Sequence, residues 1–159
     1  MVLQFQTDEP ASVAQNEKLL KPGYRQVVAG LRPAYEPKDL VGKWVALLAN
    51  LKPSNFKGVR SEGMLLTAVK GKTTGLLTVP TEVAEKLKLQ RGALAVPQDC
   101  VAAFKPNYDV KKELKKLDLM TRGADGVVFF GNSPLLIDAG NGQLVPVVGD
   151  KAGEGAKIQ

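Results

Sequence analysis

The sequence predicts a mainly β protein, in which a small barrel or sandwich is followed by a shorter segment of mixed helix and strand. Three observations support this class. Apolar runs of strand length recur along the chain, glycine and proline separate them at short intervals, and the character of the sequence changes near Phe104. The 159 residues suffice for one domain of ordinary size, or for two small modules that share a core.

The part of the chain before Phe104 contains a series of strand-like runs. Val2–Thr7 alternates apolar and polar residues, which is typical of a half-buried strand. Lys43–Ala49 is a nearly continuous apolar run that includes Trp44. The other predicted strands are Gln26–Ala29, Gly63–Val69, Gly75–Val79 and Gly92–Val96.

The segments between these runs are predicted to be loops and single turns. Asp8–Gly23 is polar, contains two prolines and is expected to be a long loop. Within Pro33–Leu40, Pro37 is expected to open one helical turn. Lys70-Gly71-Lys72 is expected to join two strands, and Thr81 is expected to cap a short helical turn from Glu82 to Leu87.

The clearest helical pattern covers Asp109–Leu119. Val110, Leu114 and Leu117 form one apolar stripe at helical spacing, and lysines occupy the opposite face. These lysines are Lys111, Lys112, Lys115 and Lys116. We interpret them as a second basic patch, with an ordinary solvated helix face as the alternative.

Strand-like runs return after this helix. They are Val127–Phe130, Leu135–Ile137 and Leu144–Val148. Asn141-Gly142 predicts a hairpin turn, because both residues tolerate a positive φ. The Gly/Lys-rich end, Asp150–Gln159, is expected to be loosely ordered.

The composition excludes several classes of site. The chain has no histidine and Cys100 is its single cysteine, so a Cys/His zinc site, an internal disulfide and a histidine general base are all excluded. Gly71-Lys72-Thr73 looks like the end of a phosphate-binding P-loop, but Leu66 stands where that motif needs glycine, so a turn is the better interpretation. We expect no metal, no cofactor and no enzymatic activity.

The charge and the apolar runs bear on partners and location. Lysine and arginine total 22 against 16 aspartates and glutamates, a net charge of +6, which favours an anionic partner such as nucleic acid or an acidic membrane. No run approaches the roughly eighteen apolar residues of a membrane span, and the first residues do not resemble a signal peptide. We expect a cytoplasmic protein without a membrane span.

The segment between Lys43–Ala49 and Gly63–Val69 collects polar and basic residues at the shared end of two predicted strands. Lysine and arginine there can meet phosphates, and asparagine and serine can reach base edges or 2′-hydroxyls. Phe56 can stack on a base. The candidate residues are Asn50, Lys52, Asn55, Lys57, Arg60 and Ser61. A solvated hairpin loop is the alternative interpretation.

Two stretches of this region resemble a known signature. Asn50-Leu51-Lys52-Pro53, followed by Lys57-Gly58-Val59-Arg60-Ser61-Glu62-Gly63-Met64, is similar to the signature of tRNA-binding oligonucleotide-binding (OB) domains. Arg25-Gln26-Val27-Val28-Ala29-Gly30-Leu31 resembles the strand just upstream in that family. Phe104–Gln159 resembles the extra C-terminal module of the endothelial monocyte-activating polypeptide II branch.

The resemblance implies an OB-fold barrel over residues 1–103 with a C-terminal α+β module over residues 104–159 packed on it. It implies that the barrel holds tRNA without catalysis and assists an aminoacyl-tRNA synthetase or a multi-synthetase complex. Asn50, Lys52, Lys57, Arg60, Ser61 and Met64 would then lie at or near the RNA, with a place in the barrel core as the alternative for Met64. Asn55, Lys111, Lys112 and Lys115 are added on residue type alone.

One departure from the family motivates a second hypothesis. The family's first barrel strand and its His-Pro segment are missing before Val2–Thr7, which leaves an expected unpaired barrel edge. A strand from another chain can fill such an edge, so oligomerisation is predicted to be possible. The alternative function is therefore a protein-interaction or assembly module with a degenerate RNA site.

Overall fold

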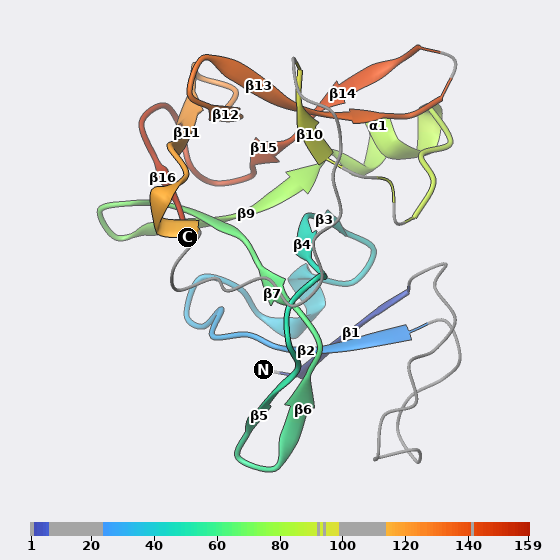
Figure 1. The fold of residues 1–159 in the computed structure, drawn as a ribbon, viewed down its shortest axis with the longest axis vertical. Helices are drawn as coiled ribbons and strands as arrows, with labels where there is room; N and C mark the ends of the chain where they lie inside the picture. Colours follow the sequence, from blue (N-terminus) through green and yellow to red (C-terminus); the bar gives the residue numbers. More distant parts are fainter. Residues whose placement is uncertain (1, 7–23, 92, 94, 99–113, 141) are drawn as a thin grey trace.

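The computed structural model describes residues 2–6, 24–91, 93, 95–98, 114–140 and 142–159, and these residues are mostly β-structure (Figure 1). The strands are β1 (Val2–Gln6), β2 (Tyr24–Val28), β3 (Trp44–Val45), β4 (Leu47–Leu48), β5 (Ser54–Phe56), β6 (Val59–Ser61), β7 (Met64–Leu65), β8 (Thr67–Lys70), β9 (Thr73–Val79), β10 (Ala95–Pro97), β11 (Leu119–Arg122), β12 (Val127–Phe130), β13 (Ser133–Asp138), β14 (Leu144–Pro146), β15 (Val148–Gly149) and β16 (Lys157–Ile158). The described helices are α1 (Thr81–Lys86) and the short 3-10 turns η1 (Pro37–Asp39) and η2 (Leu114–Lys116). The mainly β class, with an OB-like barrel, is confirmed.

The largest sheet joins strands from both halves of the sequence. Its order is β10-β13-β12-β11-β16-β8-β9-β15, with β14 paired to β13 and β3 paired to β9. Three two-stranded sheets, β1-β2, β4-β7 and β5-β6, form the lower part of the molecule (Figure 1). The barrel strands β8 and β9 therefore pair directly with strands of the C-terminal segment, β8 with β16 and β9 with β15.

Two predicted strands are each divided into two shorter ones. The run Lys43–Ala49 becomes β3, which pairs with β9, and β4, which pairs with β7. Between them, the Ala46 amide donates to the Leu77 carbonyl at 2.8 Å. Gly63–Val69 likewise divides into β7 and β8. A strand in a small barrel must bend to keep partners on both sides, and apolar runs alone do not reveal where it bends.

The C-terminal tail is ordered, so the prediction of a loose tail over Asp150–Gln159 is wrong. β16 lies between β11 and β8, and the backbones of Gln159 and Thr67 exchange two hydrogen bonds of 2.8 and 2.9 Å. Ala152 and Ala156 are buried. Small residues are needed here because the tail approaches the barrel closely. A Cβ on Gly75 would lie 2.7 Å from the amide nitrogen of Lys151.

Two apolar clusters stabilise this arrangement. The larger contains residues of the barrel and of the C-terminal segment together, such as Leu77, Val128 and Val147, all with no exposed surface. The smaller lies between η1 and the barrel and contains Leu31, Tyr35, Leu65 and Leu76. The shared larger core and the shared sheet hold the two segments together as one packed unit.

The helix predicted over Asp109–Leu119 is only partly testable. Residues 109–113 lie outside the described residues, as does Cys100. In the described part, Leu114–Lys116 is a 3-10 turn and Leu119 already begins β11, so the C-terminal end of the prediction is wrong. β11 pairs with β12 and β16, and this pairing outweighs the local helical spacing.

Smaller local predictions were partly correct. η1 confirms the helical turn at Pro37. α1 begins at Thr81 itself, with Pro80 as its N-cap, so Thr81 is not the cap; its hydroxyl donates to the Gly42 carbonyl instead. The predicted strand Gly92–Val96 is β10, shifted toward the C-terminus. Gly142 has a φ of 74° in the β13–β14 connection, while Asn141 lies outside the described residues.

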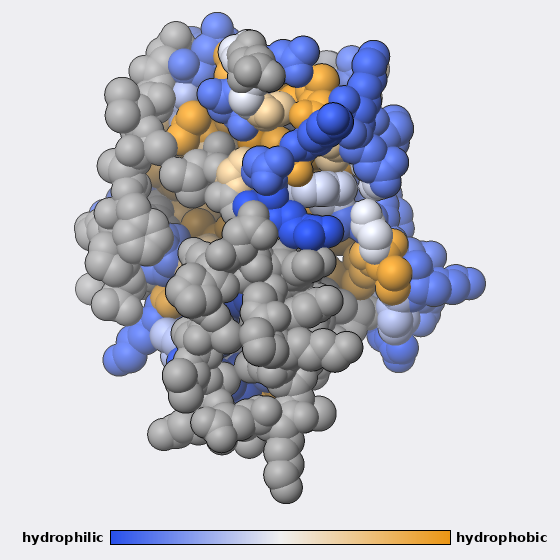
Figure 2. All heavy atoms as spheres, turned by 90° about the vertical axis from the view of Figure 1, so that its right-hand side faces the viewer, coloured by the Kyte–Doolittle hydropathy of each residue, from blue (hydrophilic) through white to orange (hydrophobic). Residues whose placement is uncertain are grey.

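The described surface is mixed in polarity. On the face shown in Figure 2, hydrophilic residues surround smaller apolar areas. Within the described residues, no helix has the length and apolar character needed to cross a membrane.

Candidate nucleic-acid interface

The β5–β6 hairpin protrudes from the lower end of the molecule (Figure 1). Phe56 pairs with Val59, so Lys57 and Gly58 alone form the turn. Their φ angles are 49° and 83°, and positive values at both central residues are what a type I′ hairpin turn requires. The polar segment that was predicted as a loop is therefore an ordered ribbon. Its signal in the sequence was weak because lysine, unlike asparagine, seldom adopts a positive φ.

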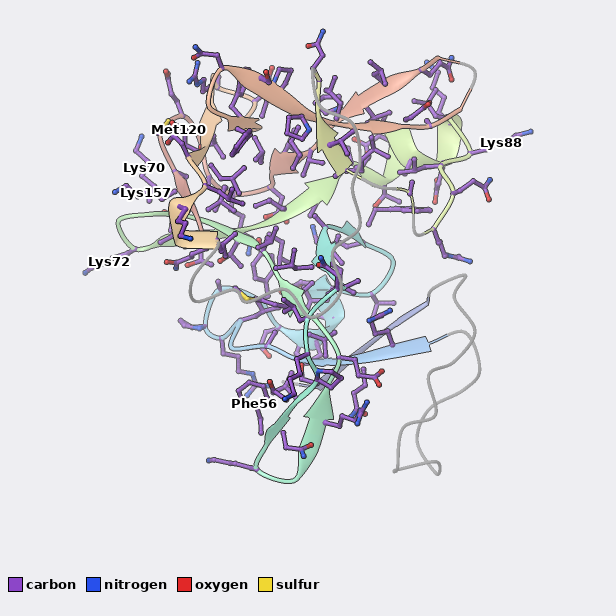
Figure 3. The ribbon with its side chains drawn as sticks, in the orientation of Figure 1. Phe56, Lys70, Lys72, Lys88, Met120 and Lys157 are labelled. Carbon is purple, nitrogen blue, oxygen red and sulfur yellow. The ribbon has the colours of Figure 1, made fainter. Side chains whose placement is uncertain are left out.

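The tip of this hairpin is fully solvent-facing. All three residues of β5 are exposed, as are Lys57 and Gly58 of the turn. Phe56 leaves 52% of its surface exposed, although aromatic side chains usually contribute to a core. The hairpin therefore presents an exposed aromatic ring at Phe56 (Figure 3) and, on the next residue, the exposed ammonium group of Lys57.

Hydrogen bonds to β2 anchor the base of the hairpin. The Gln26 side-chain amide donates to the Arg60 carbonyl at 2.8 Å, and the Glu62 amide donates to the Gln26 carbonyl at 2.9 Å. An arginine, Arg25, donates to the carbonyl of Glu62 at 2.8 Å and to that of Ala49 at 3.0 Å. An isolated two-stranded ribbon is marginally stable, so these contacts determine where the tip lies.

Ser61 belongs to this anchor and not to the exposed rim. It is 4% exposed, accepts a hydrogen bond from the Val28 amide at 3.0 Å and donates to the Gly63 carbonyl at 3.1 Å. Its hydroxyl is committed to the protein. We therefore remove Ser61 from the proposed RNA-contacting residues.

Arg60 has a divided role. Its Nε lies 3.1 Å from the Glu62 carboxylate, whose side chain is only 5% exposed, while the Arg60 side chain is 35% exposed. A buried carboxylate needs such a partner, because leaving it uncompensated is costly. The side chain of Arg60 thus stabilises the hairpin base and also reaches the surface beside the tip.

The remaining candidates lie around the hairpin or outside the described part. Lys52 is exposed and lies two residues before β5 begins, whereas Asn50 is half-buried. Met64 is half-buried in β7, opposite Leu48 of β4. Lys111 and Lys112 lie outside the described residues. Lys115 lies in η2, but its side chain is not among those described.

Comparison with known proteins identifies related sequences. Residues 15–86 match the family described as "Putative tRNA binding domain". The chain is 48% identical over 65 residues to the methionine--tRNA ligase of Thermotoga maritima, which covers 41% of this chain and 10% of that protein. It is 31% identical over 131 residues to a probable cytoplasmic methionine--tRNA ligase of Dictyostelium discoideum, covering 82% of this chain and 17% of that protein. The chain thus spans less than a fifth of these curated relatives.

The fold has a close counterpart among solved structures. The C-terminal domain of Plasmodium vivax p43 superposes with a TM-score of 0.69 over 99% of this chain and 95% of that domain, at 20% sequence identity. Its likeness extends through the C-terminal segment that the family match does not cover.

Proposed function

Because residues 15–86 belong to the tRNA-binding-domain family, we propose that this chain is a non-catalytic module that holds tRNA by the β5–β6 hairpin and its surroundings. The observation that carries the proposal is the exposed tip, where the half-exposed ring of Phe56 stands next to the exposed Lys57. Ammonium groups attract phosphates, and an exposed ring offers a stacking surface for an unpaired base.

The expected role of each surrounding residue follows from the chemistry of its side chain. Lys52 and Lys57 contact phosphates, since both are exposed and flexible. Asn55 lies on β5 beside Phe56 and can read a base edge or a 2′-hydroxyl. The exposed part of Arg60 adds a further phosphate contact. Asn50, Met64, Lys111, Lys112 and Lys115 remain proposed on the sequence pattern alone.

We also propose that the module works beside an aminoacyl-tRNA synthetase in the cytoplasm. Support comes from the relatives, which are methionine--tRNA ligases, one of them cytoplasmic. Since this chain matches less than a fifth of their length, their catalytic activity is not attributed to it. No cofactor is needed for this role.

A salt titration of tRNA binding by fluorescence anisotropy tests the proposal, with a DNA duplex of equal length as the control. The expected result is binding to tRNA that weakens steeply with salt, with a log–log slope of about −0.7 to −0.9 per phosphate contact, and weaker binding to the duplex. Absence of tRNA binding at low salt contradicts the proposal.

Self-association is a second candidate property. Among the described strands, β1 pairs only with β2, and we propose that its other edge can accept a strand from a second chain. Light scattering of the purified chain distinguishes a monomer from a strand-paired dimer. A strictly monomeric chain would remove the assembly hypothesis and leave the RNA-binding proposal intact.

A further inference from the structure

A second group of lysines lies on one flank of the molecule, apart from the β5–β6 hairpin (Figure 3). Lys70 ends β8 and Lys72 lies in the turn that leads to β9. Lys157 begins β16, the strand next to β8. All three are exposed. We call these three residues the flank lysines.

Lys157 joins Lys70 and Lys72 only in the folded chain. β16 pairs with β8 so that Lys157 lies opposite Val69, the residue before Lys70. The Lys70 ammonium group donates to the backbone carbonyl of Glu154 at 2.6 Å, which ties the turn to the C-terminal tail. The patch therefore exists because the tail packs on the barrel and brings Lys157 beside Lys70 and Lys72, which are near neighbours in the sequence.

The charge of this flank is not neutralised within the described structure. The ion pairs found there join Arg32 to Glu36, Lys43 to Asp150 and Arg60 to Glu62. The flank lysines form none of them. The hydrogen bond that Lys70 makes to Glu154 goes to its backbone carbonyl and so neutralises no charge. Three exposed ammonium groups on neighbouring strands thus produce a local positive potential.

The chemistry of the flank favours a nucleic-acid phosphate backbone over an anionic bilayer. Its apolar neighbour is Met120, which pairs with Lys157 and is half-buried. Of the exposed large apolar side chains of the described residues, Val41, Phe56 and Leu144 belong to other elements, and Leu117, which precedes β11, is only 37% exposed. The described flank therefore lacks the broad apolar face that inserts into a bilayer. Lysine suits phosphates because it is a flexible point charge without the geometry to read a base.

We propose that Lys70, Lys72 and Lys157 form a second phosphate-binding surface, which contacts the backbone of a tRNA whose other segment is held by the β5–β6 hairpin. This inference rests on the proposed function. It adds that the bound RNA extends from the hairpin to the flank built by β8, β9 and β16. An RNA too short to reach both surfaces then gains nothing from the flank lysines.

The test compares two charge-matched double variants of the full chain. Lys72→Glu/Lys157→Glu changes the flank and leaves the Lys70 contact with Glu154 in place. Lys38→Glu/Lys86→Glu, at exposed positions of η1 and α1, is the control with the same net charge. Each is titrated with tRNA and with a single-stranded oligonucleotide of about eight nucleotides, within the usual site size of one OB fold.

The flank variant is expected to bind tRNA about ten-fold more weakly than the control variant, with a salt slope reduced by about 1.4 to 1.8. The two variants should bind the oligonucleotide equally. Glu154→Gln, which removes a carboxylate but keeps the backbone contact, should strengthen tRNA binding about two-fold. That gain cannot arise from misfolding.

Three outcomes overturn the inference. Equal tRNA affinity of the two double variants shows that only net charge matters. An equal loss on tRNA and on the oligonucleotide shows that the flank is not a separate surface. Loss of binding to phosphatidylserine vesicles with tRNA affinity retained assigns the flank to membranes. In each of these cases the proposed function is retained as long as the unaltered chain binds tRNA. If the unaltered chain does not bind tRNA, the proposed function and this inference are both contradicted.

Discussion

The hydroxyl of Tyr35 donates a hydrogen bond to the carboxylate of Asp150, although the two residues are 115 positions apart. The amide of Leu76 donates to the Tyr35 oxygen at 2.8 Å and to Asp150 at 3.0 Å. The second carboxylate oxygen lies 3.0 Å from the Lys43 ammonium group. One carboxylate from the C-terminal segment thus satisfies three donors of the barrel, which links the two parts by directional contacts as well as by the shared core.

Asp150→Ala is expected to destabilise the protein by about 2–4 kcal/mol, because it leaves the buried Tyr35 hydroxyl without its acceptor and Lys43 without its ion-pair partner. Urea unfolding followed by circular dichroism measures the loss. Asp125→Ala, at an exposed aspartate, is the control and should change stability by less than about 0.5 kcal/mol. Equal effects of the two substitutions would show that the Asp150 contacts do not couple the segments.

The stability of the protein should fall in alkaline solution through Tyr35. Burial, reinforced by the hydrogen bond to Asp150, raises the pKa of the Tyr35 phenol well above its ordinary value. The folded state therefore keeps this proton while the unfolded chain loses it above roughly pH 10. The stabilisation from Tyr35 is fully present below that pH and decreases above it.

Comparison with Tyr35→Phe isolates this effect, because other titrating groups contribute equally to both proteins. The difference in unfolding free energy between the two proteins should be constant up to about pH 9. It should be smaller at about pH 11, because the unfolded form of the Tyr35 protein has then lost its phenol proton. Urea titrations at several pH values measure it. A difference that stays constant across this range would contradict the assignment.

The turn of the β5–β6 hairpin should separate a backbone requirement from a charge requirement. Gly58→Ala places a side chain at a φ of 83° and is expected to cost about 1 kcal/mol of stability without a change in charge. Lys57→Asn suits the positive φ but removes a charge, so stability should be retained while the salt slope of tRNA binding falls by about 0.7 to 0.9. Thermal unfolding and anisotropy together distinguish the two effects.

Arg60→Ala should reduce both stability and tRNA affinity. It leaves the buried Glu62 carboxylate without its 3.1 Å contact, with an expected cost of about 1–3 kcal/mol. Combining it with Glu62→Ala in a double-mutant cycle measures the coupling between the two side chains. Lys57→Gln is the matched control: it should weaken binding with unchanged stability. A stable Arg60→Ala protein with no coupling to Glu62 would contradict the anchoring role.

Phe56→Ala should weaken tRNA binding without destabilising the fold. Stacking on a base contributes about 1–3 kcal/mol, which corresponds to roughly a five- to hundred-fold loss of affinity. Because the ring is half exposed, the unfolding free energy should change by less than about 0.5 kcal/mol. Phe56→Trp should retain binding, and Val41→Ala, at another exposed apolar residue, serves as control. Equal affinity of Phe56→Ala and Val41→Ala would exclude stacking by Phe56.

Much of the local structure could be predicted from the sequence. The β class, the helical turn at Pro37 and the strand Val127–Phe130 follow from residue periodicity and from proline chemistry, which act within a few residues. The basic segment with Lys52 and Lys57 was also recognisable, because residue type alone indicates which side chains attract phosphate. Whether Ser61 faces solvent or the protein was not predictable, since its partners Val28 and Gly63 are set by strand pairing.

The sequence by itself thus determined the fold class, the likeness of residues 15–86 to tRNA-binding domains and the chemical character of the hairpin. Only the tertiary structure decided that the glycine-rich tail is ordered, that Tyr35 meets Asp150, and that Lys157 lies beside the turn carrying Lys70 and Lys72. The physical reason is the separation along the chain over which each effect acts. Residue preferences act between near neighbours in the chain, whereas strand pairing and burial join distant segments whose local patterns carry no record of their partners.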